Sequence, residues 1–123
     1  MSLLDEGLPV VDRLIHEPAR LAILSVLSGA DEVDFNYLLG ALGLTRGNLS
    51  SHMSRLADAG YVSVRKSFVS NIPHTAYSIS ETGRLALGTY WGLLDDLRGR
   101  AQAVQAQAPT SAGTRADEFG GSD

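Results

Sequence analysis

Two amphipathic helices joined by a very short link, with a hairpin directly after them, constrain the fold of this chain more than any other feature. In residues 35–42 the apolar side chains recur at the helical spacing i, i+3, i+4 and i+7, and they are Phe35, Leu38, Leu39 and Leu42. In residues 45–59 the corresponding stripe is Leu49, Met53 and Leu56. Gly43 and Gly60 follow the two stripes, where a glycine can adopt the left-handed conformation that ends a helix. Two helices joined by about three residues that include a glycine predict a helix-turn-helix.

The segments after this pair predict a β-hairpin and a long helix. Apolar and polar residues alternate in 62–65 and again in 76–79, and the intervening residues 67–73 (SFVSNIP) have the composition of a loop. We therefore expect a hairpin with a long tip. Ser80 and Glu81 begin a helix whose apolar spacing continues to residue 104, with an acidic side chain at the positive end of its dipole.

The segments before the pair predict shorter elements. Residues 9–16 place apolar side chains at helical spacing and predict a first helix. Pro18 suits the first position of a second helix, which spans 18–28 and ends at Gly29. A very short strand is expected around residues 32–34.

The order of these elements defines the predicted fold class. Side-chain oxygens of Asp34 and Thr45 are expected to cap the two helices of the pair. A helix-turn-helix followed by a hairpin is a winged helix, so we predict a mainly α protein with a small β-hairpin (α+β) and a long C-terminal helix. This domain should span residues 8–106. Residues 107–123 carry too little apolar surface to offset chain entropy, and we expect a disordered tail there.

Charge is unevenly distributed along the chain, whose net charge is −4. Residues 45–79 contain four basic residues and one acidic residue, a net charge of +3. The rest of the chain contains six basic and thirteen acidic residues, a net charge of −7. A basic segment on an acidic body is expected when one face of a protein contacts phosphates.

Two stretches carry a resemblance to a known family. They are LGLTRGNLSSHMSRLADAGYVSVRK at residues 42–66 and AYSISETGRLAL at residues 76–87. Together they resemble bacterial-type MarR- and ArsR-like winged-helix regulators, and most of all the short subgroup of winged-helix DNA-binding domain proteins. The resemblance covers residues 10–100 and implies a winged-helix fold and a role in transcription. Relatives often carry basic residues around positions where this chain has Ser51, Ser54, Ser67 and Ser70.

The helix that begins at Thr45 has the outward face that a recognition helix needs. Opposite the apolar stripe its side chains are small, polar or basic, which suits entry into a major groove about 12 Å wide. Arginine can donate two hydrogen bonds to guanine and asparagine can pair with adenine, so we predict groove contacts by Arg46, Asn48, Ser51 and Arg55. Thr45 and Ser50 are placed for phosphates at the helix N-terminus. Arg65, Lys66 and His74 are predicted to contact the sugar-phosphate backbone from the wing.

The apolar stripe of the last helix predicts a contact between subunits. The stripe is longer than is needed to cover the wing. The candidate residues are Tyr90, Trp91, Leu94 and Leu97. Operators usually mirror a two-fold axis, so we predict a homodimer with these residues in its seam. Two alternatives stay open: the two aromatic rings complete the domain's own core, or a small-molecule effector of unknown identity binds near them.

These observations predict a sequence-specific regulator of transcription, a repressor, whose partner is double-stranded DNA. The rival interpretation is a winged helix that contacts another protein without binding DNA, which the low basic content of the wing supports. The simplest alternatives are a solvated helix face and a charged hairpin that keeps its edge from pairing with other chains.

Several function classes are excluded by the sequence. There are no cysteines, which excludes disulfides, thiol catalysis and cysteine-rich zinc sites. The histidines His16, His52 and His74 fall in three separate elements, so no metal site is predicted. No phosphate loop, nucleophile elbow or HExxH motif occurs, and we expect neither an enzyme nor a cofactor. No signal peptide or membrane-spanning run is visible, which favours a cytoplasmic protein without a membrane partner.

Overall fold

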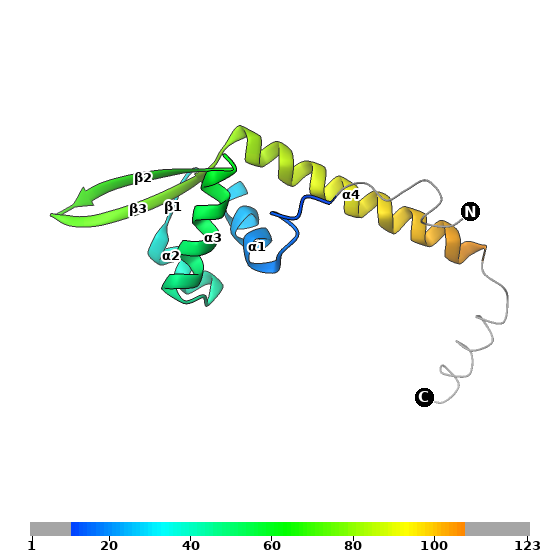
Figure 1. Cartoon of the computed structure of the whole chain (residues 1–123), viewed down its shortest axis with the longest axis horizontal. Helices are drawn as coiled ribbons and strands as arrows, with labels where there is room; N and C mark the ends of the chain where they lie inside the picture. The colour runs from blue at the N-terminus through cyan, green and yellow to red at the C-terminus, as the bar shows by residue number, and fades with distance from the viewer. Residues whose placement is uncertain (1–10, 108–123) are drawn as a thin grey trace, which may run out of the picture. The chain divides into compact units, whose positions relative to one another are not determined.

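The computed structural model describes residues 11–107, which fall into two compact units, 11–91 and 92–107. The elements are α1 (Pro18–Ser28), β1 (Val33–Asp34), α2 (Phe35–Leu42), α3 (Arg46–Asp58), β2 (Val62–Val69), β3 (Ile72–Ile79) and α4 (Glu81–Ala106). The three strands form one antiparallel sheet in the order β1-β3-β2 (Figure 1). This is a winged helix with a long C-terminal helix, as the order of sequence patterns predicted.

The predicted helix boundaries are confirmed by the capping contacts. The Asp34 carboxylate accepts a hydrogen bond from the backbone N–H of Asn36 at 3.0 Å, and the Thr45 hydroxyl accepts one from the N–H of Asn48 at 3.1 Å. Gly43 ends α2 with φ +66°, the left-handed conformation that glycine adopts without steric cost. These contacts hold α2 and α3 at the two ends of a short turn.

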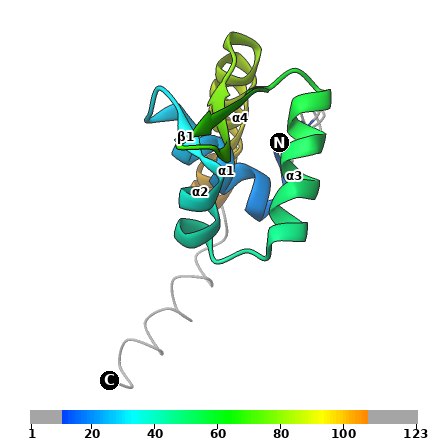
Figure 2. The ribbon, with the colours of Figure 1, turned by 90° about the vertical axis from the view of Figure 1, so that its left-hand side faces the viewer.

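The core of the first unit is made by one face of each helix and by the sheet. The apolar stripe of α3 points inward, with Leu49, Met53 and Leu56 each at most 2% exposed. It meets buried side chains of α1, α2 and the strands, which are Ile23, Leu24, Leu27, Leu38, Val62, Tyr77 and Ile79. Figure 2 shows α3 along one side of this unit, with the β2–β3 hairpin, which extends to the left in Figure 1, pointing toward the viewer. The opposite face of α3 is therefore left to solvent.

The prediction of a helix over residues 9–16 is wrong for the part that the structure describes, residues 11–16. Residues 11–17 form a turn in which the Asp12 carboxylate accepts hydrogen bonds from the backbone N–H groups of Leu14 and Ile15. Such bonds compete with a helix, and Pro18 holds the preceding residue, Glu17, in an extended conformation with φ −154°. The apolar side chains of this segment therefore belong to a turn, in which Ile15 is fully buried.

The long hairpin tip predicted at residues 67–73 is also wrong. Both strands continue to a two-residue turn, and Val69 pairs with Ile72. Ser70 and Asn71 have φ values of +52° and +65°, which is the geometry of a type I′ turn. Asparagine tolerates this conformation well, so the turn closes without glycine. Pro73 lies within β3, where a proline is tolerated if its missing N–H faces away from the ladder.

The start of α4 is fixed against the end of α3. The Ser80 hydroxyl donates a hydrogen bond to the carbonyl of Gly60 at 2.6 Å and accepts one from the N–H of Gly83 at 3.0 Å. The backbone N–H of Ser80 donates to the carbonyl of Tyr61 at 2.9 Å. These bonds tie together the two ends of the hairpin, and so they set where the wing emerges beside α3.

The second unit is described only as the helical residues 92–106 of α4 and Gln107. Ion pairs join Arg98 to Asp95 and Arg100 to Asp96 at 2.9 and 3.1 Å, with both side chains of the first pair exposed. Two parts of the predicted domain organisation lie outside the described residues. They are residues 108–123 of the predicted tail (107–123) and residues 8–10 of the predicted domain (8–106).

An alkaline pH dependence follows from the contact between Tyr61 and Asp12. The Tyr61 hydroxyl donates to Asp12 Oδ2 at 2.5 Å, and this bond, helped by burial, raises the pKa of Tyr61 to about 12 from 10.0. A pKa raised in the folded state stabilises the fold below pH 10 and loses that contribution as pH rises toward 12. Tyr61→Phe is expected to lower the free energy of unfolding by about 1 kcal/mol at pH 7.

Urea unfolding of both proteins at several pH values checks this expectation. The difference between variant and wild type should shrink as pH rises from 10 toward 12. Burial also raises the pKa of Tyr77, but that residue is present in both proteins and cancels in the difference. A difference that stays constant with pH would show that the hydrogen bond to Asp12 does not contribute.

Candidate nucleic-acid interface

The outward face of α3 and its flank toward α2 carry every candidate residue that the sequence analysis placed on this helix. All of them are exposed, together with the cap residue: Thr45, Arg46, Asn48, Ser50, Ser51 and Arg55. Asn48, Ser50, Ser51 and Arg55 are exposed because they lie about 90° or more around the helix from the centre of the inward stripe, whereas Arg46 lies on the flank of the stripe that faces α2. The result is a surface of small polar side chains with an arginine near each end.

Arg46, at the start of α3, is held by the neighbouring helix. Its Nη1 donates a hydrogen bond to Asn36 Oδ1 at 3.3 Å, and its guanidinium carbon lies 5.2 Å from the centroid of the Phe35 ring. The partner amide is neutral, so the side chain keeps its full positive charge. Arg46 is thus oriented by α2 while it remains exposed.

Arg55, near the other end of α3, makes no ion pair or side-chain hydrogen bond within the described residues. Its side chain is exposed on the same outward face. A guanidinium that has no partner in its own chain keeps all its donors available for a bound molecule.

A shallow cleft of about 240 Å³ separates α3 from the wing. Ser50 and Ser54 line it from α3, Val64 and Lys66 line it from β2, and the Tyr77 side chain contributes from β3. Ser50 and Lys66 are both predicted site residues, and the fold brings them to opposite sides of one cleft. The cleft therefore combines hydroxyl groups with a positive charge.

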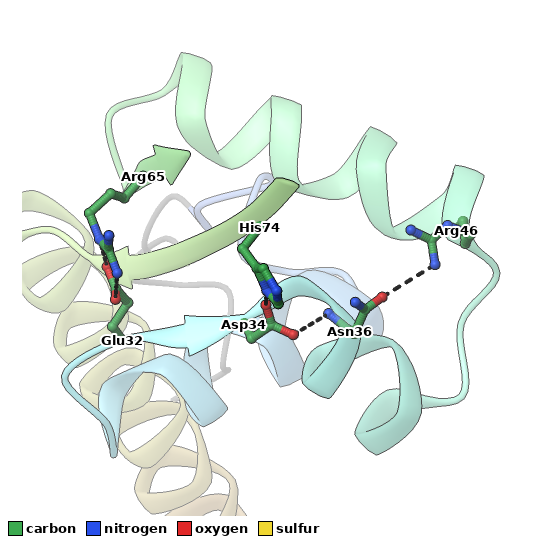
Figure 3. A network of polar contacts seen from close by, with 6 residues as sticks. All are labelled: Glu32, Asp34, Asn36, Arg46, Arg65 and His74. Carbon is green, nitrogen blue, oxygen red and sulfur yellow. Dashed lines mark hydrogen bonds and ion pairs between the residues drawn. The ribbon is translucent and has the colours of Figure 1, made fainter. Parts of the chain in front are cut away.

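The wing divides its predicted basic residues between its two faces. Neighbouring residues of a strand point to opposite sides, so Lys66 faces the α3 cleft whereas Arg65 faces away. The Arg65 guanidinium forms two hydrogen bonds to Glu32, at 2.7 and 2.5 Å, and His74 Nδ1 lies 3.4 Å from Asp34 Oδ1 (Figure 3). The structure thus brings Lys66 to the face shared with α3 and does not bring Arg65 there.

The ion pair between Arg65 and Glu32 also affects how both groups titrate. The hydrogen bonds from Arg65 hold the pKa of the Glu32 carboxyl below its usual value. The same bonds raise the pKa of the Arg65 guanidinium. Both groups therefore stay charged at neutral pH, and the charge of each is balanced by the other.

The wing tip has an exposed apolar surface that the sequence analysis treated as loop. Phe68, Val69 and Ile72 are exposed beside the Ser70–Asn71 turn. The sequence analysis also missed Glu32 as a site residue. Glu32 comes close to Arg65 only because β3 pairs with both β1 and β2. The two residues are 33 positions apart, so no local sequence pattern could have predicted their contact.

The predicted seam residues fall into different environments. Tyr90 is 5% exposed, and its hydroxyl lies 2.8 Å from His16 Nδ1, so this ring belongs to the domain core rather than to a surface. Trp91 packs edge-on against Tyr90 and is 44% exposed. Leu94 and Leu97, three residues apart, share one face of the 92–106 segment.

His52 points toward α1 instead of the outward face. Its Nδ1 lies 3.2 Å from Arg20 Nη1 and 4.0 Å from Glu17 Oε1. Arg20 is buried, and its Nε also donates to the carbonyl of Leu14 at 2.6 Å. His52 therefore helps dock α3 on α1. Within residues 11–107, no group of three or more His, Cys, Asp or Glu side chains is arranged to hold a metal ion.

The fold and the exposed polar face of α3 define a winged-helix protein of the kind found in transcriptional regulators. Residues 19–97 match the family described as winged helix DNA-binding domain. The chain belongs to this family.

Two individual proteins are similar to this chain over most of its length. An uncharacterized protein from Methanocaldococcus jannaschii is 35% identical over 78 residues, which cover 63% of this chain and 85% of the relative. A transcriptional regulator homologue from Pyrococcus horikoshii superimposes with a TM-score of 0.68 at 26% identity, over 73% of this chain and 89% of that one.

A possible transcriptional regulator for arsenical resistance shares the fold, with a TM-score of 0.59 at 24% identity over 81% and 99% of the two chains. The resemblance to the winged-helix DNA-binding domain subgroup is confirmed by the family match, and the winged-helix fold by both structures. Family and fold are those of regulators of transcription. Among residues 11–107, none of the helices combines the length and the hydrophobicity that a membrane span requires.

Proposed function

We propose that this chain is a sequence-specific DNA-binding repressor that acts as a homodimer. In this proposal α3 enters the major groove and the wing follows the sugar-phosphate backbone. The observation that carries it is the outward face of α3, where polar and basic side chains are exposed and apolar bulk is absent. A cytoplasmic location, as expected from the sequence, is consistent with this role.

The chemistry of the α3 face supports contacts to base edges. Asn48 and Arg55 have side chains without partners in the described part of the chain, so their donors and acceptors are available to bases. The Thr45 oxygen caps its own helix, but its O–H can still donate to a phosphate. Ser51 lies between Asn48 and Arg55 on the same surface.

The cleft between α3 and the wing supports a backbone contact. A phosphodiester accepts hydrogen bonds and attracts positive charge, and the cleft offers the Ser50 and Ser54 hydroxyls together with Lys66. A phosphate bound there would lie between the helix in the major groove and the wing. This contact would position the protein on DNA without reading its sequence.

The homodimer is proposed from α4. Trp91 is exposed, and Leu94 and Leu97 continue an apolar stripe along the same helix. Two copies joined through α4 could place two α3 helices in successive major grooves, roughly 34 Å apart. Sedimentation equilibrium at tens of micromolar should give twice the monomer mass, and Trp91→Glu should restore the monomer mass. A monomeric wild-type protein would refute this part of the proposal.

Selection from a pool of random double-stranded DNA tests the function itself. We expect enrichment of one motif with inverted half-sites, and binding that weakens steeply as salt rises because phosphate contacts release counterions. Contacts to three phosphates per subunit, six in the dimer, should give a slope of log K against log salt of about −5. No enriched motif, with no salt-dependent binding, would refute DNA recognition and favour the protein-contact interpretation.

A further inference from the structure

Three of the candidate DNA-contacting side chains are bound by one short segment, residues 32–36. Figure 3 shows Arg65 on Glu32, His74 beside Asp34, and Arg46 on Asn36. The segment runs from the residue before β1 into the first turn of α2. Arg55 and Lys66 have no such contact. The interface therefore contains basic side chains that contact their own chain and basic side chains without such a contact in the described residues. Among the former, Arg65 alone bonds to a carboxylate through its guanidinium.

The Arg65–Glu32 contact is the strongest of the three. Nε donates to Oε2 at 2.7 Å and Nη2 donates to Oε1 at 2.5 Å, so both carboxylate oxygens and one edge of the guanidinium are used. This paired geometry is the one that arginine also uses to bind a phosphate. The Arg65 side chain is nevertheless 62% exposed, which leaves the edge of the pair open to a competing anion.

We propose that Glu32 limits the affinity of this protein for DNA by holding Arg65 in an ion pair that competes with the phosphate backbone. The inference rests on the proposed function, and it assigns a role in DNA binding to an acidic residue outside α3 and the wing. Glu32 acts only through Arg65 and does not itself contact DNA.

Electrostatics explains why the competition is effective. A phosphate that approaches Arg65 must replace a carboxylate already bonded to the same N–H groups, and it meets the negative charge of Glu32 at close range. Arg46 differs, because its acceptor, Asn36, is neutral and leaves the charge of the guanidinium available. The phosphate-binding charge of the wild-type protein is thus concentrated on α3 and on Lys66.

Glu32→Gln is the direct test, because it removes the charge and keeps the size of the side chain. We measure the dissociation constant of a fluorescently labelled duplex selected by the wild-type protein, as a function of salt. The variant should bind about fivefold more tightly at low salt, the range expected for releasing an exposed ion pair. Its slope of log K against log salt should steepen by about 0.9 for each added phosphate contact.

Asp31→Asn is the matched control. It removes the same charge one residue earlier from an exposed side chain that has no partner within the described residues. If Glu32 acted only through net charge, both variants would tighten binding equally, and that result would overturn the proposal. A merely structural role for the pair predicts a lower melting temperature for Glu32→Gln with unchanged affinity, which would overturn it as well.

Arg65→Ala, made in the wild-type protein and in the Glu32→Gln variant, tests whether Glu32 affects DNA binding through Arg65. In wild type this substitution should change affinity less than twofold, whereas in the Glu32→Gln background it should abolish the gain. A large loss on replacing Arg65 in wild type would mean that Arg65 already contacts DNA and that Glu32 does not withhold it. If the wild-type protein selects no duplex, the proposed function fails first and this inference fails with it.

Discussion

Replacement of Gly83 by alanine is expected to destabilise the folded protein by about 2 kcal/mol and to lower its melting temperature by about 10 °C. Gly83 lies in the first turn of α4, against Tyr61, the residue that precedes β2. A Cβ at this position would lie 2.2 Å from the carbonyl oxygen of Tyr61 and 3.0 Å from its carbonyl carbon. Backbone atoms cannot rotate away, so the first turn of α4 would have to move. Calorimetry of the variant and the wild type measures the effect.

Gly88→Ala is the matched control for this prediction. Gly88 lies in the same helix and is exposed, and a Cβ added there would meet no atom within 4 Å. Alanine should therefore stabilise α4 at position 88 by about 0.5–1 kcal/mol, because it loses less backbone entropy than glycine. Opposite signs at positions 83 and 88 would separate close packing from helix propensity. A stabilising Gly83→Ala would contradict the geometry of this contact.

The carbonyl that excludes a side chain at position 83 also has a bonding role. The Tyr61 oxygen accepts the backbone N–H of Ser80 at 2.9 Å, and the Ser80 hydroxyl bonds to the carbonyl of Gly60 at 2.6 Å. The close approach at Gly83 therefore allows α4 to begin directly against the end of α3. Both strands of the wing leave from this junction. A variant that shifts α4 should consequently disturb the cleft between α3 and the wing.

The parts of this fold that could be predicted depend on contacts between near neighbours in the sequence. Thr45 caps α3 through an N–H three residues away, and Gly43 ends α2 through its own backbone conformation. The buried stripe of α3 repeats within a helical period. Each of these signals lies within one or two turns of chain, so the sequence was enough to place α2, α3 and their outward faces.

The features that could not be predicted depend on tertiary context or on competition between two local signals. Residues 9–16 had helical spacing, but the Asp12 carboxylate and Pro18 favour a turn in the part that the structure describes. The hairpin tip had the composition of a loop, yet Ser70 and Asn71 close it in two residues. The pairing of Arg65 with Glu32 arises from strand order alone, so a count of basic residues overstated the charge that the wing offers to DNA.

Arg55→Ala is expected to weaken binding to a selected duplex by about 30-fold, which corresponds to about 2 kcal/mol for the loss of a two-bond contact to a base. Arg55 is exposed and unpaired within the described residues, so the variant should fold with a melting temperature close to that of wild type. Fluorescence anisotropy on the selected duplex measures the change. Arg13→Ala removes the same charge from an exposed residue of the N-terminal turn and should change affinity less than threefold.

Arg55→Lys separates recognition of a base from attraction to phosphate. Lysine keeps the positive charge but cannot present two parallel N–H groups, so it should retain the salt dependence of wild type and lose preference for one base pair of the motif. A phosphate contact by Arg55 would give the reverse result, with alanine lowering the salt slope by about 0.9 and lysine restoring affinity for every sequence alike. Wild-type affinity in the alanine variant would place Arg55 outside the DNA contact, and α3 would then have to read the groove through Asn48 and Ser51.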